Sequence, residues 1–398
     1  MDLSSRERML NALNCQPVDY APCCFMQFTA LESRCNDQLE MVQRQLEWGL
    51  DAMVQTPPCL MTVTGDTADL RGLPVHFNSE VQIKEWVEQR GGERYPTIFK
   101  EYITPVGALS IRVNKTLDWP YGNHIPFLDD FIIPRAQKPL ITSPDDLKGL
   151  RYLLAPPTLD VIADFQTTSR PLIDFAVKHD LLRSGGLSAG ADMAGWLCGL
   201  QNLIYLAIEE PDFVVELMHI IAAWNLDRME IVLDEGVDLW VRRGWYENCD
   251  FWSPKLYRQF ILPHLKKEVE LAHSQRVKFG YIVTNNVLPL LDMIIEAKVD
   301  VLIGVDPVMG EADLKVVREK VHGRLCQWGG VNAPLTVEKG SEKEVRKAVK
   351  EALDVMAPGN GFILSPVDDI EDPSEHTWNN VRIFIQAWRN WYNGHGMM

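Results

Sequence analysis

This chain of 398 residues lacks long apolar runs, paired cysteines and an excess of positive charge. No apolar run approaches the ~18 residues that a membrane-spanning helix needs, and the chain begins as a polar amphipathic helix rather than a signal peptide. We therefore expect a cytoplasmic protein with no membrane partner. The net charge of −16 also argues against nucleic acid as a partner, because phosphate backbones are bound by excess Lys and Arg.

Common cofactor and metal motifs are also missing. The eight cysteines are spread along the chain without a C-x-x-C pair, which excludes a disulfide framework and a thiolate zinc pattern. No G-x-G-x-x-G follows an expected strand, and neither H-E-x-x-H nor a Walker pattern occurs. What the chain does contain is a regular rhythm of hydrophobic strands and helices.

Alternation of strands with helices is regular from about residue 150 onward. Counting two earlier segments, we expect strands at 19–27, 51–55, 181–190, 237–242, 277–283, 299–305, 325–330 and 361–365. This alternation predicts parallel strands joined by right-handed crossovers, and it fits a closed barrel better than an open sheet. The sequence therefore predicts an α/β fold, a (β/α)₈ TIM barrel, in which residues 1–398 form a single domain.

Residues 60–150 interrupt this rhythm. Thr, Gly and Val are frequent in the first part of the segment, and 102–113 alternate as a β-strand pair around a turn at Pro105-Val106-Gly107. We interpret the segment as an insertion that contains a β-hairpin and covers one mouth of the barrel.

Candidate substrate-binding residues follow from the barrel prediction, because function in such folds lies at the C-terminal ends of the strands. They come at or just after the expected strands and are Met26, Asp192, Trp245, Asn285, Trp328 and Asn332. An aspartate or asparagine at such a position can equally be a helix cap or a turn residue. Several tryptophans at one mouth would instead form a flat apolar pocket for an aromatic ring.

Candidate catalytic residues are those that can carry a proton at the rim. Glu247 lies between aromatic residues just past a buried strand, where desolvation raises the pKa of a carboxyl and suits it to act as a general acid. Asp368 and His376 are further candidates for the acid, and Tyr246 is a candidate hydrogen-bond donor. The sequence leaves open whether Glu247, Asp368 and a histidine together hold a metal.

Short motifs along nearly the whole chain point to one superfamily. They include Arg6-Glu7-Arg8, Val18-Asp19, Thr104-Pro105-Val106-Gly107, Ser253-Pro254-Lys255-Leu256-Tyr257, Pro289-Leu290-Leu291, Gly330-Val331-Asn332 and Asn380. In order and spacing the chain resembles the uroporphyrinogen decarboxylase superfamily. Each motif is weak alone, and together they are more specific for the superfamily than for any branch of it.

Two branches of that superfamily can be compared with the chain. True uroporphyrinogen decarboxylases carry an Arg-Gln-Ala-Gly-Arg run for the carboxylates of their substrate, whereas this chain has 26–30 (MQFTA). Thiol-methylating members bind zinc through His-x-Cys and a later Cys. This chain has Ile282-Val283-Thr284 and Pro366-Val367-Asp368 there, which puts zinc in doubt.

The resemblance therefore implies the O-demethylating, corrinoid-dependent branch. Such an enzyme takes a methyl group from a methoxylated substrate, here expected to be aromatic, and passes it to the cobalt of cobalamin on a separate corrinoid-binding protein. One alternative is a decarboxylase or lyase of the same fold, which would need arginines at the mouth, such as Arg183, Arg242 or Arg243. Another is a non-catalytic binding barrel, in which the rim acids would be exposed and scattered.

Overall fold

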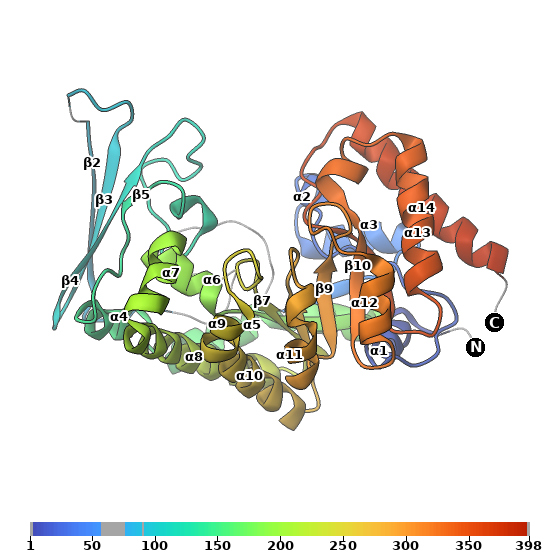
Figure 1. The fold of residues 1–398 in the computed structure, drawn as a ribbon, viewed down its shortest axis with the longest axis horizontal. Helices are drawn as coiled ribbons and strands as arrows, with labels where there is room; N and C mark the ends of the chain where they lie inside the picture. Colours follow the sequence, from blue (N-terminus) through green and yellow to red (C-terminus); the bar gives the residue numbers. More distant parts are fainter. Residues whose placement is uncertain (1–2, 57–75, 90, 396–398) are drawn as a thin grey trace.

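A seven-stranded parallel sheet forms the centre of the computed structural model, which describes residues 3–56, 76–89 and 91–395 (Figure 1). In spatial order its strands are β1 (Met53–Gln55), β6 (Leu182–Ala189), β7 (Leu239–Arg243), β8 (Lys278–Ile282), β9 (Val301–Val305), β10 (Cys326–Asn332) and β11 (Phe362–Val367). Every neighbouring pair is parallel, as the alternation of strands and helices predicted. The expected TIM-barrel-like α/β fold is confirmed.

The segment around Cys23 completes the curled sheet between β11 and β1. Instead of the strand expected at 19–27, the structure has a single parallel bridge between Cys23 and Leu364. Leu364 donates its N–H to Pro22 O at 2.8 Å, and Cys24 donates to Leu364 O at 3.0 Å. On the other side, Asp51 N–H donates to Cys23 O at 2.9 Å. Pro22 has no N–H to extend a ladder, so the eighth position in the barrel is held by a short irregular segment.

Helices surround the sheet and bury its outer face. They are α1 (Ser5–Leu13), α2 (Thr29–Glu32), α3 (Gln38–Glu47), α4 (Asp146–Leu153), α5 (Leu159–His179), α6 (Ala191–Cys198), α7 (Leu200–Glu209), α8 (Pro211–Asp234), α9 (Pro254–Phe260), α10 (Leu262–Ser274), α11 (Leu291–Glu296), α12 (Leu314–Val321), α13 (Glu342–Met356) and α14 (Glu375–His395). Capping boxes begin α1 at Ser4 and α13 at Ser341, as expected for helices that start in polar loops. Helix α8 packs on β6, α10 on β8 and α13 on β10. None of the helices described is both long and apolar enough to cross a bilayer.

Strand residues alternate between the barrel interior and the surrounding helices. In β7, Leu239 and Val241 belong to the interior cluster, which also contains Ile303 and Trp328. Trp240 belongs to the cluster shared with the helices. The same alternation places Arg243 toward the mouth of the barrel and Arg242 toward α10, which decides the different roles of these adjacent arginines.

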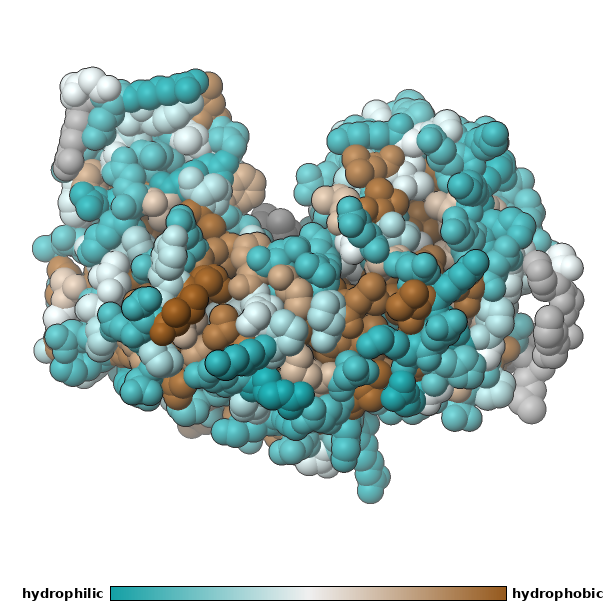
Figure 2. Space-filling model, in the orientation of Figure 1, coloured by the Kyte–Doolittle hydropathy of each residue, from teal (hydrophilic) through white to brown (hydrophobic). Residues whose placement is uncertain are grey.

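A second sheet comes from the segment expected to be an insertion. It is antiparallel and contains β2 (Gln82–Glu88), β3 (Thr97–Thr104), β4 (Gly107–Asn114) and β5 (Ala136–Lys138) in that order. The predicted hairpin is confirmed, because β3 and β4 pair from Thr97–Asn114 to Thr104–Gly107. This sheet stands to one side of the barrel, and a deep hollow separates it from the part that carries α13 and α14 (Figures 1 and 2). Residues 60–75 of the expected insertion lie outside the described residues.

Candidate functional site

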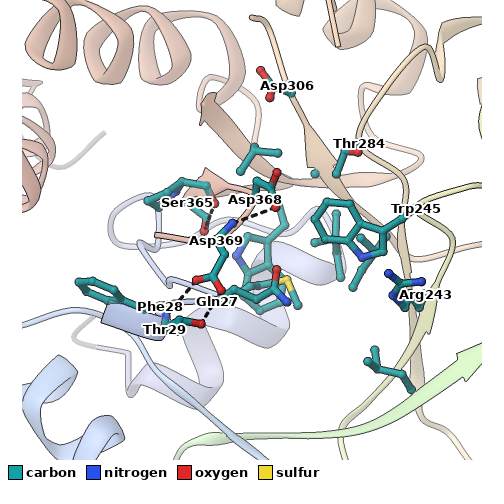
Figure 3. A pocket seen from close by; sticks show the side chains of 18 of the residues that line it. Gln27, Phe28, Thr29, Arg243, Trp245, Thr284, Asp306, Ser365, Asp368 and Asp369 are labelled. Carbon is teal, nitrogen blue, oxygen red and sulfur yellow. Dashed lines mark hydrogen bonds between the residues drawn. The ribbon is translucent and has the colours of Figure 1, made fainter. Parts of the chain in front are cut away.

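A cavity of about 580 Å³ opens at the C-terminal ends of the barrel strands (Figure 3). Strands β7, β8, β9 and β11, with the loops that follow them, supply much of its wall. The 3₁₀ turn between β4 and β5 of the second sheet, η1 (Asp130–Ile132), adds residues from the other side of the hollow. Six of the expected site residues line this cavity, namely Met26, Trp245, Tyr246, Asn285, Trp328 and Asp368. The prediction that the site lies at the strand ends therefore matches the position of this cavity.

Aromatic and thioether side chains form much of the wall. Trp245, Tyr246 and Phe251 follow β7, and Met26 and Phe28 come from the segment that closes the barrel. Tyr246 and Phe251 meet edge to face with ring centroids 5.6 Å apart. Such walls favour a ligand with a flat apolar body.

Trp328 lines the cavity and is fixed in place. Its side chain is fully buried, and Nε1 donates a hydrogen bond to Cys24 O at 2.9 Å. Two other tryptophans, Trp196 and Trp252, are buried in the core shared with the helices. Neither of them lines the cavity.

Asp368 is the carboxyl that best fits an acid at the rim. It follows β11 directly, in the left-handed backbone region at φ 72°, and its side chain lines the cavity (Figure 3). Burial raises the pKa of Asp368. The N–H of Asp369 opposes this increase, and the carboxylates of Asp369, Asp306 and Glu338 add to it. A carboxyl whose proton is retained in this way can donate it to a leaving group.

Arg243 is neutralised by two carboxylates. Its Nη1 lies 2.5 Å from Asp192 Oδ2, and its Nη2 lies 2.6 Å from Asp130 Oδ2. Asp130 Oδ1 also accepts hydrogen bonds from Tyr246 Oη at 2.8 Å and Trp196 Nε1 at 2.9 Å. Burial would raise the pKa of Asp130, but the Arg243 charge and these two donors lower it overall. The carboxylate therefore holds Arg243 and Tyr246 in one arrangement at the cavity wall.

Asp192 lies behind the cavity wall, fully buried, rather than in it. Besides Arg243, it accepts hydrogen bonds from Trp245 N at 3.0 Å and Tyr246 N at 2.8 Å. Burial raises the pKa of Asp192 to about 6, against the opposing charge of Arg243, and nearby Glu247 adds to the increase. Sequence reasoning expected Asp192 to bind substrate. The structure instead makes it the residue that positions the loop carrying Trp245 and Tyr246.

Asp130 was not among the predicted site residues, although its contact with Arg243 connects η1 to the end of β7. It is distant in sequence from Arg243 and lies in a loop whose prolines and acids carry no catalytic pattern. The only available signal was the pair Asp129-Asp130 in the expected insertion. Because the contact depends on tertiary folding, local sequence could not identify it.

Replacing Asp130 with Asn is expected to lower the free energy of unfolding by about 1–3 kcal/mol, because hydrogen bonds to a charged partner are lost. Urea denaturation measures this change. The matched control is Asp145→Asn, since the Asp145 carboxylate is 89% exposed and, within the described part of the chain, its ion pair is with exposed Lys148. A loss in Asp130→Asn no larger than in the control would show that the Arg243 contact contributes little.

Glu247 is completely buried and does not line the cavity. Its Oε1 accepts from Arg242 Nη2 and from Ala191 N, both at 2.7 Å, and its Oε2 accepts from Tyr281 Oη at 2.5 Å. Arg242 also pairs with buried Glu268 in α10. Desolvation was expected to make Glu247 a rim acid, but the structure gives both of its oxygens partners behind the wall. In this position it has no direct route to a substrate.

Two more expected site residues lie outside the cavity. Asn332 is fully buried; its Nδ2 donates to Asp306 Oδ2 at 2.6 Å and so fixes a carboxylate that does line the cavity. His376 is exposed in the first turn of α14, and its Nε2 lies 3.1 Å from Gly340 O. The structure thus gives Asn332 a positioning contact and places His376 on the outer surface.

Residues 186–190 fit a G-x-S-x-G pattern, but the hydroxyl of its serine is not free. Ser188 is completely buried within β6; its Oγ donates to Glu268 Oε2 at 2.6 Å and accepts from Trp240 Nε1 at 3.2 Å. A nucleophile of this motif needs an exposed hydroxyl beside a base. Ser188 is therefore part of the buried network rather than of the cavity.

A bound zinc ion would need several Cys, His, Asp or Glu side chains close together. Among the residues that the structure describes, no group of three or more His, Cys, Asp or Glu side chains is arranged to hold an ion. At two positions where the resemblance implies zinc ligands in thiol-methylating members, this chain has Ile282 and Thr284. Neither side chain is a zinc ligand. The donor set seen here does not fit the zinc site of the thiol-methylating branch.

Comparison with protein families identifies the chain. The family model described as uroporphyrinogen decarboxylase (URO-D) matches residues 118–391, which is more than half of the chain. The chain belongs to the uroporphyrinogen decarboxylase family. The match includes the strand ends that line the cavity from β7 onward. A search of curated proteins finds no match.

One solved structure shares the fold over nearly the whole chain. A methyltransferase from Methanosarcina mazei is similar with a TM-score of 0.61 and 18% identity, over 98% of this chain and 100% of that chain. A B12-independent methionine synthase from Shewanella sp. W3-18-1 has a TM-score of 0.42 and 10% identity, over 57% of this chain and 65% of the other. At 18% identity, the first of these matches shows the fold alone.

Proposed function

We propose that this URO-D family member is a methyltransferase that takes a methyl group from a methoxylated aromatic substrate. The acceptor is the cobalt of a corrinoid carried by a separate protein. The observation that carries the proposal is Asp368, a carboxyl with a raised pKa at the edge of a cavity with aromatic walls. The fold shared with the Methanosarcina mazei methyltransferase supports the reaction class.

The chemistry requires help for a poor leaving group. The bond between the methyl carbon and the aryl oxygen breaks, the methyl group goes to Co(I) of the corrinoid, and the electron pair stays on oxygen. Asp368 gives its proton to that oxygen, which leaves as a neutral phenol, and solvent then reprotonates the carboxylate. This step does not require a second acid from the wall.

Asn285 is the residue best placed to hydrogen-bond the leaving oxygen. Its side chain lines the cavity, and no hydrogen bond of its amide is found among the described residues. Tyr246, the other expected donor, gives its hydroxyl to Asp130. Asn285 therefore takes this role, and Tyr246 holds the wall.

The decarboxylase alternative required arginines at the mouth. Arg242 is buried between Glu247 and Glu268, and Arg183 lies near the start of β6, where it contacts Asp238. Only Arg243 lines the cavity, and its two ends pair with carboxylates. Among the described residues, the cavity wall therefore offers no unpaired arginine to a carboxylated substrate.

The direct test is methyl transfer to cob(I)alamin, free or on a carrier protein, from a panel of methoxylated phenols. We expect methylcobalamin absorbance to appear together with an equal amount of the demethylated phenol. Parallel reactions with a chelator and with added zinc test for a metal requirement. If no methyl ether is turned over but carboxylated aromatics or porphyrinogens release carbon dioxide, the decarboxylase replaces this proposal.

A further inference from the structure

The cavity wall carries a large excess of negative charge. Seven carboxyl groups line it, and they belong to Glu32, Asp130, Asp250, Asp306, Asp368, Asp369 and Glu371. Among the described residues, the only cationic side chain in the wall is Arg243, which is already paired with Asp130 and Asp192. A ligand that enters the cavity therefore meets a negative field that the described wall residues do not balance.

The excess is greatest where β9 and β11 end. Asp306, Asp368, Asp369 and Glu371 lie there, and no Lys or Arg among the described residues forms an ion pair with any of them. The hydrogen bonds that Asp369 accepts come from Thr29 N at 2.9 Å and from the Thr29 hydroxyl, which are neutral donors. Burial and the neighbouring carboxylates raise the pKa of Glu371, as they do for Asp368.

Two independent features support a role of this wall in ligand binding. Thr284 is more than nine-tenths buried and lines the cavity, yet no hydrogen bond of its hydroxyl is found in the described part of the chain. Trp245, Tyr246 and Phe251 supply aromatic surface, and an aromatic face attracts a cation. Among the described residues, no three carboxylates are arranged to chelate a metal ion, so an organic cation fits this wall better.

We propose that the cavity selects aromatic methyl ethers that carry an ammonium group and rejects those that carry a carboxylate. The methyl-ether part of this inference rests on the proposed function. The preference for a positively charged ligand is a separate claim that does not depend on it. The ammonium group lies against the wall of Asp369 and Glu371, while the ring lies against Trp245. A carboxylate in the same place would meet like charges without a free arginine.

The experiment compares the binding of three ligands that share one methoxybenzene ring and differ in the end of the side chain: ammonium, hydroxyl or carboxylate. Calorimetric titration of the full-length protein, without corrinoid, measures each dissociation constant. We expect the ammonium ligand to bind about tenfold or more tightly than the carboxylate ligand, with the hydroxyl between them. The difference should shrink as ionic strength rises.

Variants test whether the wall causes the preference. Glu371→Gln is expected to reduce the ammonium-to-carboxylate ratio about two- to fivefold, because one partly exposed charge is removed. The matched control is Glu375→Gln, which removes the same charge from the exposed start of α14 outside the cavity and should leave the ratio unchanged.

Each outcome decides the inference. Tighter binding of the carboxylate, equal binding of all three ligands, or failure of the ammonium ligand to bind at millimolar concentration overturns it. An equal change of the ratio in Glu371→Gln and Glu375→Gln also overturns it. If the ammonium ligand binds selectively but gives no methylcobalamin, the charge preference stands and the proposed reaction fails.

Discussion

Replacing Asp368 with Asn should lower the rate of methyl transfer about 10²–10⁴-fold, the contribution that a positioned general acid makes. Asn has nearly the same shape as Asp and tolerates the left-handed backbone at this position, so the fold should be kept. The change removes the proton that the leaving phenolate needs. Single-turnover transfer to cob(I)alamin measures the loss directly.

The choice of leaving group separates an acid from a structural role. The loss in Asp368→Asn should shrink as the phenol becomes more acidic, because a better leaving group needs less protonation. If all donors lose the same factor, Asp368 supports the cavity but does not donate the proton. Glu375→Gln, which lies outside the cavity, is the control for a simple change of charge.

The pH profile tests the same assignment with the unchanged protein. The acid must be protonated, so the rate should fall as pH rises through the pKa of Asp368. Burial and three neighbouring carboxylates raise that pKa, so the fall should occur at a higher pH than for an ordinary aspartate. In Asp368→Asn this decline should be absent. Its persistence in the variant would assign the titration to another group.

The sequence could predict the barrel because its signals are local. Each strand is a short hydrophobic run followed by a helix with its own start signal, and such patterns do not depend on distant contacts. The rule that function lies at strand ends then identified Trp245, Asn285 and Asp368, which do line the cavity. The exception among the strands is 19–27, where Pro22 and irregular pairing leave one bridge.

The chemistry of each rim residue was harder to predict because it depends on partners far away in sequence. Glu247 looks like a free acid beside aromatic residues until Arg242 and Tyr281 are seen to occupy its oxygens. Similarly, Arg243 looks like a binding site for an anion until Asp130 reaches it from the second sheet's side of the hollow. A single sequence does not show which of two neighbouring arginines will be neutralised by which carboxylate.

The second large effect should come from Arg242. Replacing it with Met is expected to lower the free energy of unfolding by about 3–5 kcal/mol, because buried Glu247 and Glu268 would lose their shared cation. Arg258→Met is the matched control: Arg258 is 57% exposed and pairs with half-exposed Glu296, so its loss should cost about 1 kcal/mol or less. Chemical denaturation of both variants gives the comparison.

A triple variant shows whether the buried charges cause that loss. Adding Glu247→Gln and Glu268→Gln to Arg242→Met removes the uncompensated carboxylates, and part of the stability should return. No recovery would mean that the packing of the Arg242 side chain between β7 and α10, rather than its charge, stabilises the protein. Since Glu247 also accepts from Ala191 N at the start of α6, the network connects the stability of the barrel to the loop that carries Trp245. Loss of the network should therefore weaken ligand binding even in the fraction of protein that stays folded.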